Sequence, residues 1–239
     1  MDNRRFIARN IADMLHDGDF VNLGVGMPTL VGAYIPKNIT VFLHGENGNI
    51  GANAIIPCPD AERVQWEIDH GGENGDWMTG HRDLTNASGE LITLMPGGCC
   101  FDSCTAFVMA RGGHLDATVL GGLQVDEEGN LANWMIPGKR VTGMGGAMDL
   151  VSGAKRVIIA MEHCTKTGEP KIVKKCTMPL TAVKCVSAVV TELCILEWQN
   201  GRFVVTAMAP GVSREELCAK TAIELEFAPA IREMIVPEN

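Results

Sequence analysis

Short apolar runs separated by turns that contain glycine or proline recur along this chain, and most of them have the length of buried β-strands. The clearest strand predictions are residues 20–23, 40–43, 91–95, 116–121 and 156–161. The run at 156–161, Arg-Val-Ile-Ile-Ala-Met, is continuously apolar, which is typical of a strand buried on both faces of a parallel sheet. The pattern therefore favours a sheet protein with a parallel centre.

Apolar residues at helical spacing predict an opening amphipathic helix that ends at Asp17-Gly18; they are Phe6, Ile7, Ile11, Met14 and Leu15. A second helix is expected to start at Pro28 and to run to about Tyr34. This helix lies between the strands predicted at 20–23 and 40–43, so the three elements form a βαβ crossover. Asp102 or Ser103 is expected to cap a further helix.

Towards the carboxyl end, strands are predicted at 186–190 and 193–198, with a tight hairpin at Asn200-Gly201 into residues 203–206. Ser213-x-x-Glu216 is a capping box that opens a last helix. No linker or change of composition divides the chain. We expect one α/β domain over residues 1–239, with an open, mostly parallel sheet and flanking helices.

The composition narrows the class of partner. The chain has 239 residues, 46% of them hydrophobic and 21% charged, with a formal net charge of −9. This acidic balance argues against a nucleic-acid partner, because phosphate binding requires a basic surface. No apolar run reaches the ~18 residues of a membrane span. The amino terminus leads into an amphipathic pattern instead of a signal sequence, so we expect a cytoplasmic protein with no membrane association.

The nine cysteines are an odd number without a CxxC pair, which argues against a disulfide framework and indicates a reducing compartment. Cys99, Cys100 and Cys104 lie near His114, and a metal site or a cysteine nucleophile could be built from them. A zinc site normally has a second ligand pair, which this sequence lacks. We therefore expect no metal, and buried thiols near the active cleft.

The strongest candidate for chemistry is Glu46. It follows the strand predicted at 40–43 and stands between Gly45 and Gly48, so its carboxylate is expected in a turn at the end of a strand. That position suits a nucleophile or a general base. A second Glu-Asn-Gly, at Glu73, is not preceded by an apolar strand, and we interpret the segment 57–81 as a long surface excursion that acts as a lid or an interface element.

Two glycine-rich turns are candidates for anion binding. Gly24-x-Gly26 could cradle a phosphate, although a tight strand-to-helix turn is the simpler interpretation. Gly143-x-Gly145-Gly146 stands before a short helical run, and consecutive main-chain N–H groups there could bind an oxyanion or only form a tight loop. His163, at a strand end, could be an acid or base or a polar anchor.

The segment 43–48, Leu-His-Gly-Glu-Asn-Gly, resembles the Ser-Glu-Asn-Gly signature of family I coenzyme A transferases. Gly45 stands where that family usually has serine, and Asn49 where it tends to have an aliphatic residue. Residues 132–139 and 143–149 resemble segments of 3-oxoacid CoA-transferase β subunits, and the resemblance extends over most of the chain.

The resemblance implies the fold shared with ribose-5-phosphate isomerase and glucosamine-6-phosphate deaminase. It implies that Glu46 attacks an acyl-CoA thioester and becomes a glutamyl-CoA thioester, with CoA as a substrate and no permanently bound cofactor. The residues implied as substrate or CoA contacts are Asn47, Gly145, Gly146, Asn133 and Lys139. Asn47 is also a candidate for orienting the glutamate.

The resemblance further implies a homologous α subunit, often in an α2β2 assembly, and exchange of short-chain acids of the acetoacetate, butyrate, acetate and succinate class. Two alternatives stay open at this level. The same glutamate could serve an acyl-CoA hydrolase, because water competes as the nucleophile. The chain could also be a non-catalytic ligand-binding subunit on the same fold, although such a subunit has no need for an activated carboxylate.

Overall fold

A computed structural model describes residues 2–55, 84–138 and 143–237 of the chain, without the side chains of 53–55. The excursion predicted at 57–81 and Lys139 lie outside these residues. The helices are α1 (Asn3–Ala12), the 3-10 helix η1 (Met27–Tyr34), α3 (Ser103–Arg111), α4 (Ala147–Gly153) and α5 (Arg214–Ala219). None of the described helices has the length and apolar character needed to cross a bilayer.

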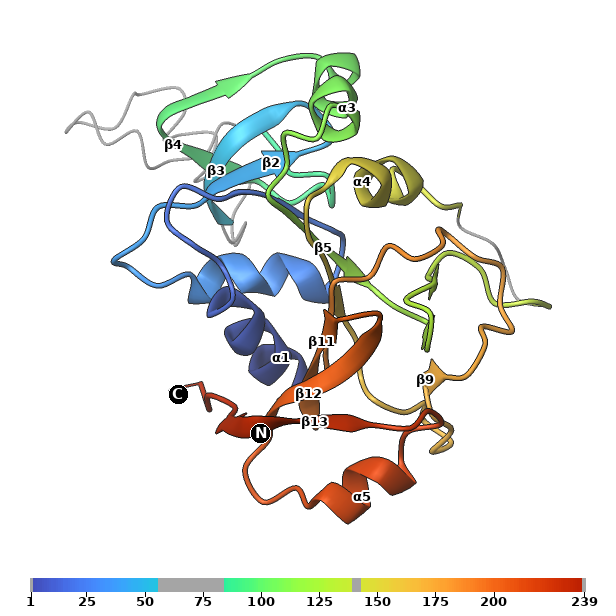
Figure 1. The fold of residues 1–239 in the computed structure, drawn as a ribbon. Helices are drawn as coiled ribbons and strands as arrows, with labels where there is room; N and C mark the ends of the chain where they lie inside the picture. The colour runs from blue at the N-terminus through green and yellow to red at the C-terminus, as the bar shows by residue number, and fades with distance from the viewer. Residues whose placement is uncertain (1, 56–83, 139–142, 238–239) are drawn as a thin grey trace.

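The main sheet has ten strands in the order β13-β12-β11-β10-β8-β5-β1-β2-β3-β4. Figure 1 labels β3 and β4 at one end of this sheet and β11, β12 and β13 at the other. The strands of its centre are β1 (Phe20–Leu23), β2 (Phe42–Gly45), β5 (Ala117–Gly121), β8 (Val157–Ala160) and β10 (Ala188–Val190). All neighbours within this centre are parallel. The α/β class and the mostly parallel sheet expected from the sequence are therefore confirmed.

The margins of this sheet include antiparallel hairpins. On one side lie β3 (Asn49–Ile55) and β4 (Ile92–Cys100), and on the other β11 (Cys194–Gln199), β12 (Arg202–Met208) and β13 (Glu226–Glu233). Neighbouring strands are antiparallel along β2, β3 and β4 and along β10, β11 and β12, whereas β13 is parallel to β12. A smaller sheet, β7-β6-β9, contains β6 (Gln124–Asp126), β7 (Leu131–Ala132) and β9 (Ile172–Val173).

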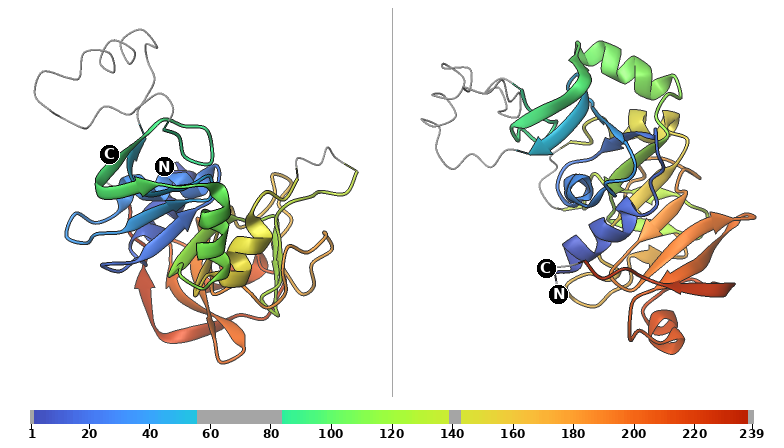
Figure 2. Two further views of the ribbon diagram at one scale, coloured as in Figure 1. Left: turned by 90° about the horizontal axis from the view of Figure 1, so that it is seen from above. Right: turned by 90° about the vertical axis from the view of Figure 1, so that its left-hand side faces the viewer.

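Strands β8 and β10 are buried at every position, as their continuous apolar sequences predict. Ile158 belongs to the hydrophobic cluster beneath α1 and η1, whereas its neighbour Ile159 belongs to the cluster on the side of α4. The views in Figure 2 show the helices on the two sides of the sheet and the two chain termini side by side. The amide of Asn10 in α1 exchanges hydrogen bonds with the main chain of Ile235, which ties the two ends together.

Two local predictions are wrong at the margin of the sheet. The strand predicted to end before Pro96 continues as β4 to Cys100, and β3 was not predicted after Glu46. Pro96 has no main-chain N–H group to donate to a neighbouring strand. It is tolerated in β4 because β4 is an edge strand. The opening helix also ends earlier than predicted, at Ala12 instead of Asp17-Gly18. Three other local predictions are confirmed: Asp102 caps α3, Ser213 caps α5, and Asn200 and Gly201 form the hairpin turn with positive φ angles.

Candidate active site

Glu46 lies in the turn that joins β2 to β3, at the carboxyl end of a parallel strand, as the sequence predicts. The turn is closed by a hydrogen bond from Gly48 N to Gly45 O of 2.9 Å. Gly48 has a φ of +112°, and a Cβ atom there would collide with the carbonyl oxygen of Phe101. The glycine therefore lets the chain before α3 pass directly against the turn that carries the carboxylate.

Asn22 in β1 holds the carboxylate in place. Its Nδ2 atom donates to Glu46 Oε2 at 2.8 Å and to the main-chain oxygen of His44 at 3.2 Å, while its Oδ1 accepts from the Thr118 hydroxyl at 3.2 Å. Asn22 is fully buried and is paired in register with His44 on one side and Thr118 on the other. Hydrogen bonds that link Thr118 in β5, Asn22 in β1 and the end of β2 thus orient Glu46.

Asn22 was not predicted as a site residue from the sequence. The available signal was an asparagine inside a strand that otherwise consists of apolar residues, Phe-Val-Asn-Leu at 20–23. Burying an amide is unfavourable unless its hydrogen bonds are satisfied, so an asparagine at such a position marks a polar partner on a neighbouring strand. For Asn22, one such partner is Glu46, which lies 24 positions later in the chain.

His44 is buried two residues before Glu46, and its ring packs edge-on against Phe20 with the centroids 5.3 Å apart. Burial lowers the pKa of His44, and the Ala106 main chain and the Glu46 carboxylate offset this lowering only in part. Its Nε2 atom makes no hydrogen bond within the described residues. Burial therefore favours the neutral form of the ring beside the carboxylate.

Asn47 does not orient Glu46 in this structure, contrary to the role considered for it. Its Nδ2 donates to the main-chain oxygen of Thr85 at 2.7 Å, and its Oδ1 accepts from Asn49 at 3.1 Å. The hydrogen bond to the glutamate comes from Asn22 instead. Because Asn47 is exposed beside Glu46, its contact with a substrate stays a prediction.

The glycine loop before α4 is connected to this turn through α3. A Cβ atom on Gly146 would lie 2.7 and 2.8 Å from atoms of the Phe107 ring, so the loop packs closely on α3. The preceding residue of α3, Ala106, is the one whose main chain acts on His44. Gly143 and Gly145 are exposed and adopt φ angles of +95° and +53°. One helix therefore separates the two segments that the sequence singles out.

Asn133 is placed differently. It follows β7 in the small sheet, where Thr181 Oγ1 donates to its Oδ1 at 2.6 Å and accepts from its main-chain N–H at 3.1 Å. These two hydrogen bonds hold the loop after β7 in place. Neither of them joins Asn133 to Glu46. The predicted substrate contacts of Asn133 and of Lys139, which is not described, stay predictions.

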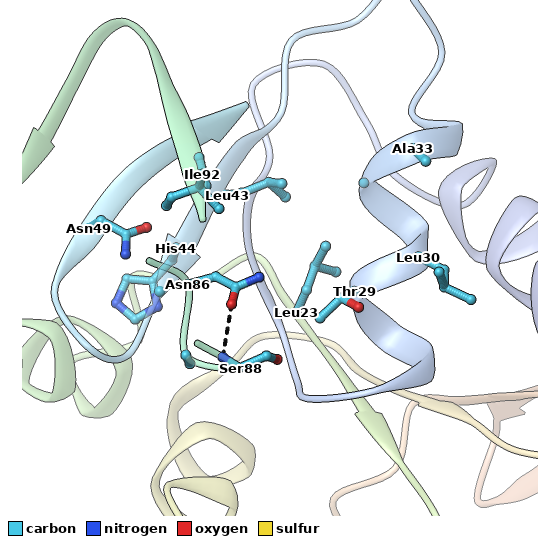
Figure 3. A pocket seen from close by; sticks show the side chains of 14 residues that line it. Leu23, Thr29, Leu30, Ala33, Leu43, His44, Asn49, Asn86, Ser88 and Ile92 are labelled. Carbon is cyan, nitrogen blue, oxygen red and sulfur yellow. Dashed lines mark hydrogen bonds between the residues drawn. The ribbon is translucent and has the colours of Figure 1, made fainter. Parts of the chain in front are cut away.

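A cavity of about 320 Å³ opens beside the Glu46 turn (Figure 3). Its walls come from η1, from β2 and β3, and from the turn at 86–88, and they are mostly apolar. The labelled lining residues are Leu23, Thr29, Leu30, Ala33, Leu43, His44, Asn49, Asn86, Ser88 and Ile92, and Gly45 also contributes. This volume is at the small end of ligand pockets and suits a short chain.

The remaining candidates have structural roles or differ from expectation. Gly24 packs on β5, where a Cβ would lie 2.9 Å from a Leu120 methyl group, which supports the tight-turn interpretation of Gly24-x-Gly26. His163 is fully buried with both ring nitrogens against threonine hydroxyls, as expected of a polar anchor, and burial lowers its pKa to about 4.

The expectation of buried thiols is wrong for Cys99, Cys100 and Cys104, all of which are exposed. Residues 99 and 100 end an edge strand, and residue 104 lies in the first turn of α3, so neither element encloses them. No cluster of histidine, cysteine or acidic side chains within the described parts of the chain could hold a metal ion.

The model of the coenzyme A transferase family matches residues 5–220. This chain belongs to the coenzyme A transferase family. The enzyme class expected from the signature around Glu46 is therefore confirmed at the level of the family. The β subunit of the Haemophilus influenzae acetate CoA-transferase is 49% identical over 100% of this chain and 98% of its own length.

A second relative comes from Bacillus subtilis, where it is named as one of the subunits of a probable succinyl-CoA:3-ketoacid coenzyme A transferase, and it is 46% identical over 94% of either chain. Among solved structures, glutaconate coenzyme A-transferase from Acidaminococcus fermentans superposes with a TM-score of 0.71 at 18% identity, over 100% of this chain and 90% of that one. The fold is thus that of the CoA-transferases. Both relatives are named as subunits, which implies a partner subunit.

Proposed function

We propose that this chain is the catalytic β subunit of an enzyme that moves CoA between an acyl-CoA and a short-chain carboxylic acid through a thioester on Glu46. The observation that carries the proposal is the carboxylate held by Asn22 at the end of a buried strand, beside a small apolar cavity. A hydrogen bond to one carboxylate oxygen orients the group and leaves the other oxygen as the nucleophile.

In the first half-reaction, Glu46 attacks the carbonyl carbon of the donor acyl-CoA, and the CoA thiolate departs to leave a mixed anhydride. The thiolate then attacks the side-chain carbonyl of Glu46 and releases the donor acid as its carboxylate. The product is the glutamyl-CoA thioester. The overall exchange converts one thioester and one carboxylate into another thioester and another carboxylate, so it is nearly thermoneutral, and a carboxylate is a suitable nucleophile and an equally suitable leaving group.

In the second half-reaction, the acceptor carboxylate attacks the Glu46 thioester and the thiolate departs again. The thiolate then attacks the acceptor's carbonyl in the second anhydride, which gives the new acyl-CoA and regenerates the Glu46 carboxylate. Each addition creates an oxyanion. Main-chain N–H groups of Gly145 and Gly146 are the proposed donors, and one such donor is typically worth about 2.7–4 kcal/mol in the transition state.

The assembly belongs to the same proposal. The relatives named as subunits support a homologous α subunit, for which we propose an α2β2 arrangement, and Asn47, Asn133 and Lys139 are proposed contacts for substrate or CoA. CoA is a substrate here and no permanently bound cofactor is required. The names of the two relatives contain acetate and 3-ketoacids, and these acids are candidates for the carboxylic acids between which this enzyme moves CoA.

The test is intact-mass spectrometry of the chain co-expressed with its partner subunit, after incubation with acetoacetyl-CoA and then borohydride or hydroxylamine. The wild-type chain should acquire a mass adduct that peptide mapping locates at Glu46. Glu46→Gln should acquire none and yet bind CoA. Release of free acid and CoA by the wild-type chain, without any adduct or acid exchange, would instead favour the hydrolase.

A further inference from the structure

Gly45 and Asn49 are the two positions that depart from the family signature, and they are direct neighbours in the structure. They are cross-strand partners in the β2–β3 hairpin. A Cβ atom on Gly45 would lie 2.7 Å from Asn49 Nδ2 and 2.9 Å from its Oδ1. The amide of Asn49 therefore occupies the volume that a side chain at position 45 would need, so the glycine admits the asparagine.

The orientation of the Asn49 amide is determined by its partners. Its Nδ2 donates to the main-chain oxygen of Thr85 at 3.2 Å, and a carbonyl oxygen can only accept. The other end, Oδ1, is then an acceptor, and it has no hydrogen-bond partner within the described residues although Asn49 is only 2% exposed. Buried acceptors are rarely left unpaired, so we infer that Asn49 Oδ1 accepts a hydrogen bond from a donor group of a bound ligand.

The surroundings of Asn49 define that donor. Asn49 and Gly45 line the cavity of about 320 Å³, whose other walls include Leu23, Leu43 and Ile92 (Figure 3). An ammonium group would find no carboxylate among the described lining residues and would be poorly solvated by these apolar walls. A hydroxyl group is neutral and can donate one hydrogen bond to Asn49 Oδ1. The rest of a short acyl chain would contact mainly hydrocarbon.

We propose that Asn49 is a specificity-determining residue that makes this pocket select short acyl chains bearing a hydroxyl group over plain alkyl chains. The inference rests on the proposed function, because it assigns the pocket beside Glu46 to the acyl part of the CoA ester. A site that hydrogen-bonds a substrate hydroxyl discriminates strongly against the analogue without it, because the buried acceptor is then left unpaired.

The experiment compares butyryl-CoA with 3-hydroxybutyryl-CoA and 4-hydroxybutyryl-CoA as donors, using the chain together with its partner subunit. The readout is kcat/KM for adduct formation at Glu46. The wild type should favour one hydroxylated ester by at least about 10-fold over butyryl-CoA. Asn49→Leu should reduce that ratio to about one or below. Thr29→Val changes a hydroxyl on the opposite wall that already donates to Gly26 O, and it should keep the ratio.

The outcomes separate this inference from the proposed function. Adducts that form equally fast from all three esters in the wild type overturn the role of Asn49 and leave the transferase chemistry standing. Absence of any adduct refutes the proposed covalent mechanism at Glu46. Saturation-transfer NMR with butyrate and the two hydroxybutyrates then tests the selectivity of the pocket. Equal binding of the three acids overturns the role proposed for Asn49. If Asn49→Leu does not fold, Asn49→Ala also removes the acceptor, and a preference that survives in Asn49→Ala overturns the inference.

Discussion

Asn22 Nδ2 donates a hydrogen bond of 2.8 Å to Glu46 Oε2, and the same nitrogen also donates to the main chain of His44. The two side chains are brought together because β1 and β2 are parallel neighbours with Asn22 in register with His44. The position of the proposed nucleophile thus depends on a buried residue of another strand, and Asn22 acts as a positioning residue.

Asn22→Ala should lower kcat by roughly 10- to 100-fold, since a hydrogen bond to a charged group typically contributes 1.5–3 kcal/mol. The measurement is steady-state exchange by the complex with its partner subunit. Thr118→Val is the matched control, because it removes a bond to Asn22 Oδ1 and leaves the donor to Glu46 in place. Equal losses in the two variants would mean that Asn22 acts through strand stability alone.

Gly48→Ala should destabilise the fold by more than about 3 kcal/mol, because it combines a positive φ with a collision against the Phe101 main chain. Urea unfolding followed by circular dichroism measures the change. Gly18 has a φ of +81°, but no heavy atom of the described residues lies within 4 Å of its Cβ position. Gly18→Ala should therefore cost only about 1 kcal/mol. Similar values for both variants would contradict the close approach.

Gly146→Ala should destabilise the chain by about 1–3 kcal/mol, because the added methyl group overlaps the Phe107 ring. Phe107→Leu should relieve the overlap, so the double variant should be more stable than the sum of the single changes. Gly121 has open space at its Cβ position among the described residues, and Gly121→Ala is the control with little expected loss. Strict additivity of the two changes would show that α3 does not restrict the loop.

Stability should fall as the pH drops from about 6.5 towards 4, because His163 has a pKa of about 4 in the folded chain and an ordinary pKa of 6.5 when unfolded. A depressed histidine pKa means that the unfolded state binds the proton first, so the stability present above pH 6.5 is lost progressively below it. The loss at pH 5 should be roughly 2 kcal/mol. Urea unfolding at several pH values measures it.

His163→Gln is the matched variant for this prediction, because glutamine can still bond to threonine hydroxyls but does not titrate. Its stability should be lower at pH 7 and should fall less steeply than that of the wild type between pH 6.5 and 5. A slope as steep as that of the wild type would assign the pH dependence to other groups, such as His44, whose pKa burial also lowers.

The elements that depend on local patterns could be predicted from the amino-acid sequence. The apolar run before Glu46, the apolar run at 157–160 and the cap at Asp102 each became the predicted strand or helix. These succeed because periodicity and capping act over a few residues and need no knowledge of the neighbouring elements. The family signature around Glu46 is local in the same sense.

The residues that surround Glu46 could not be predicted in this way, because they come from several strands. Asn22 and Thr118 reach the site because of the order β5-β1-β2, and Asn49 faces Gly45 because β3 folds back on β2. Sheet order and burial result from packing among segments far apart in the chain. This is also why Cys99 and Cys100 are exposed although buried thiols were expected: they end β4, which has a neighbouring strand on one side only among the described residues.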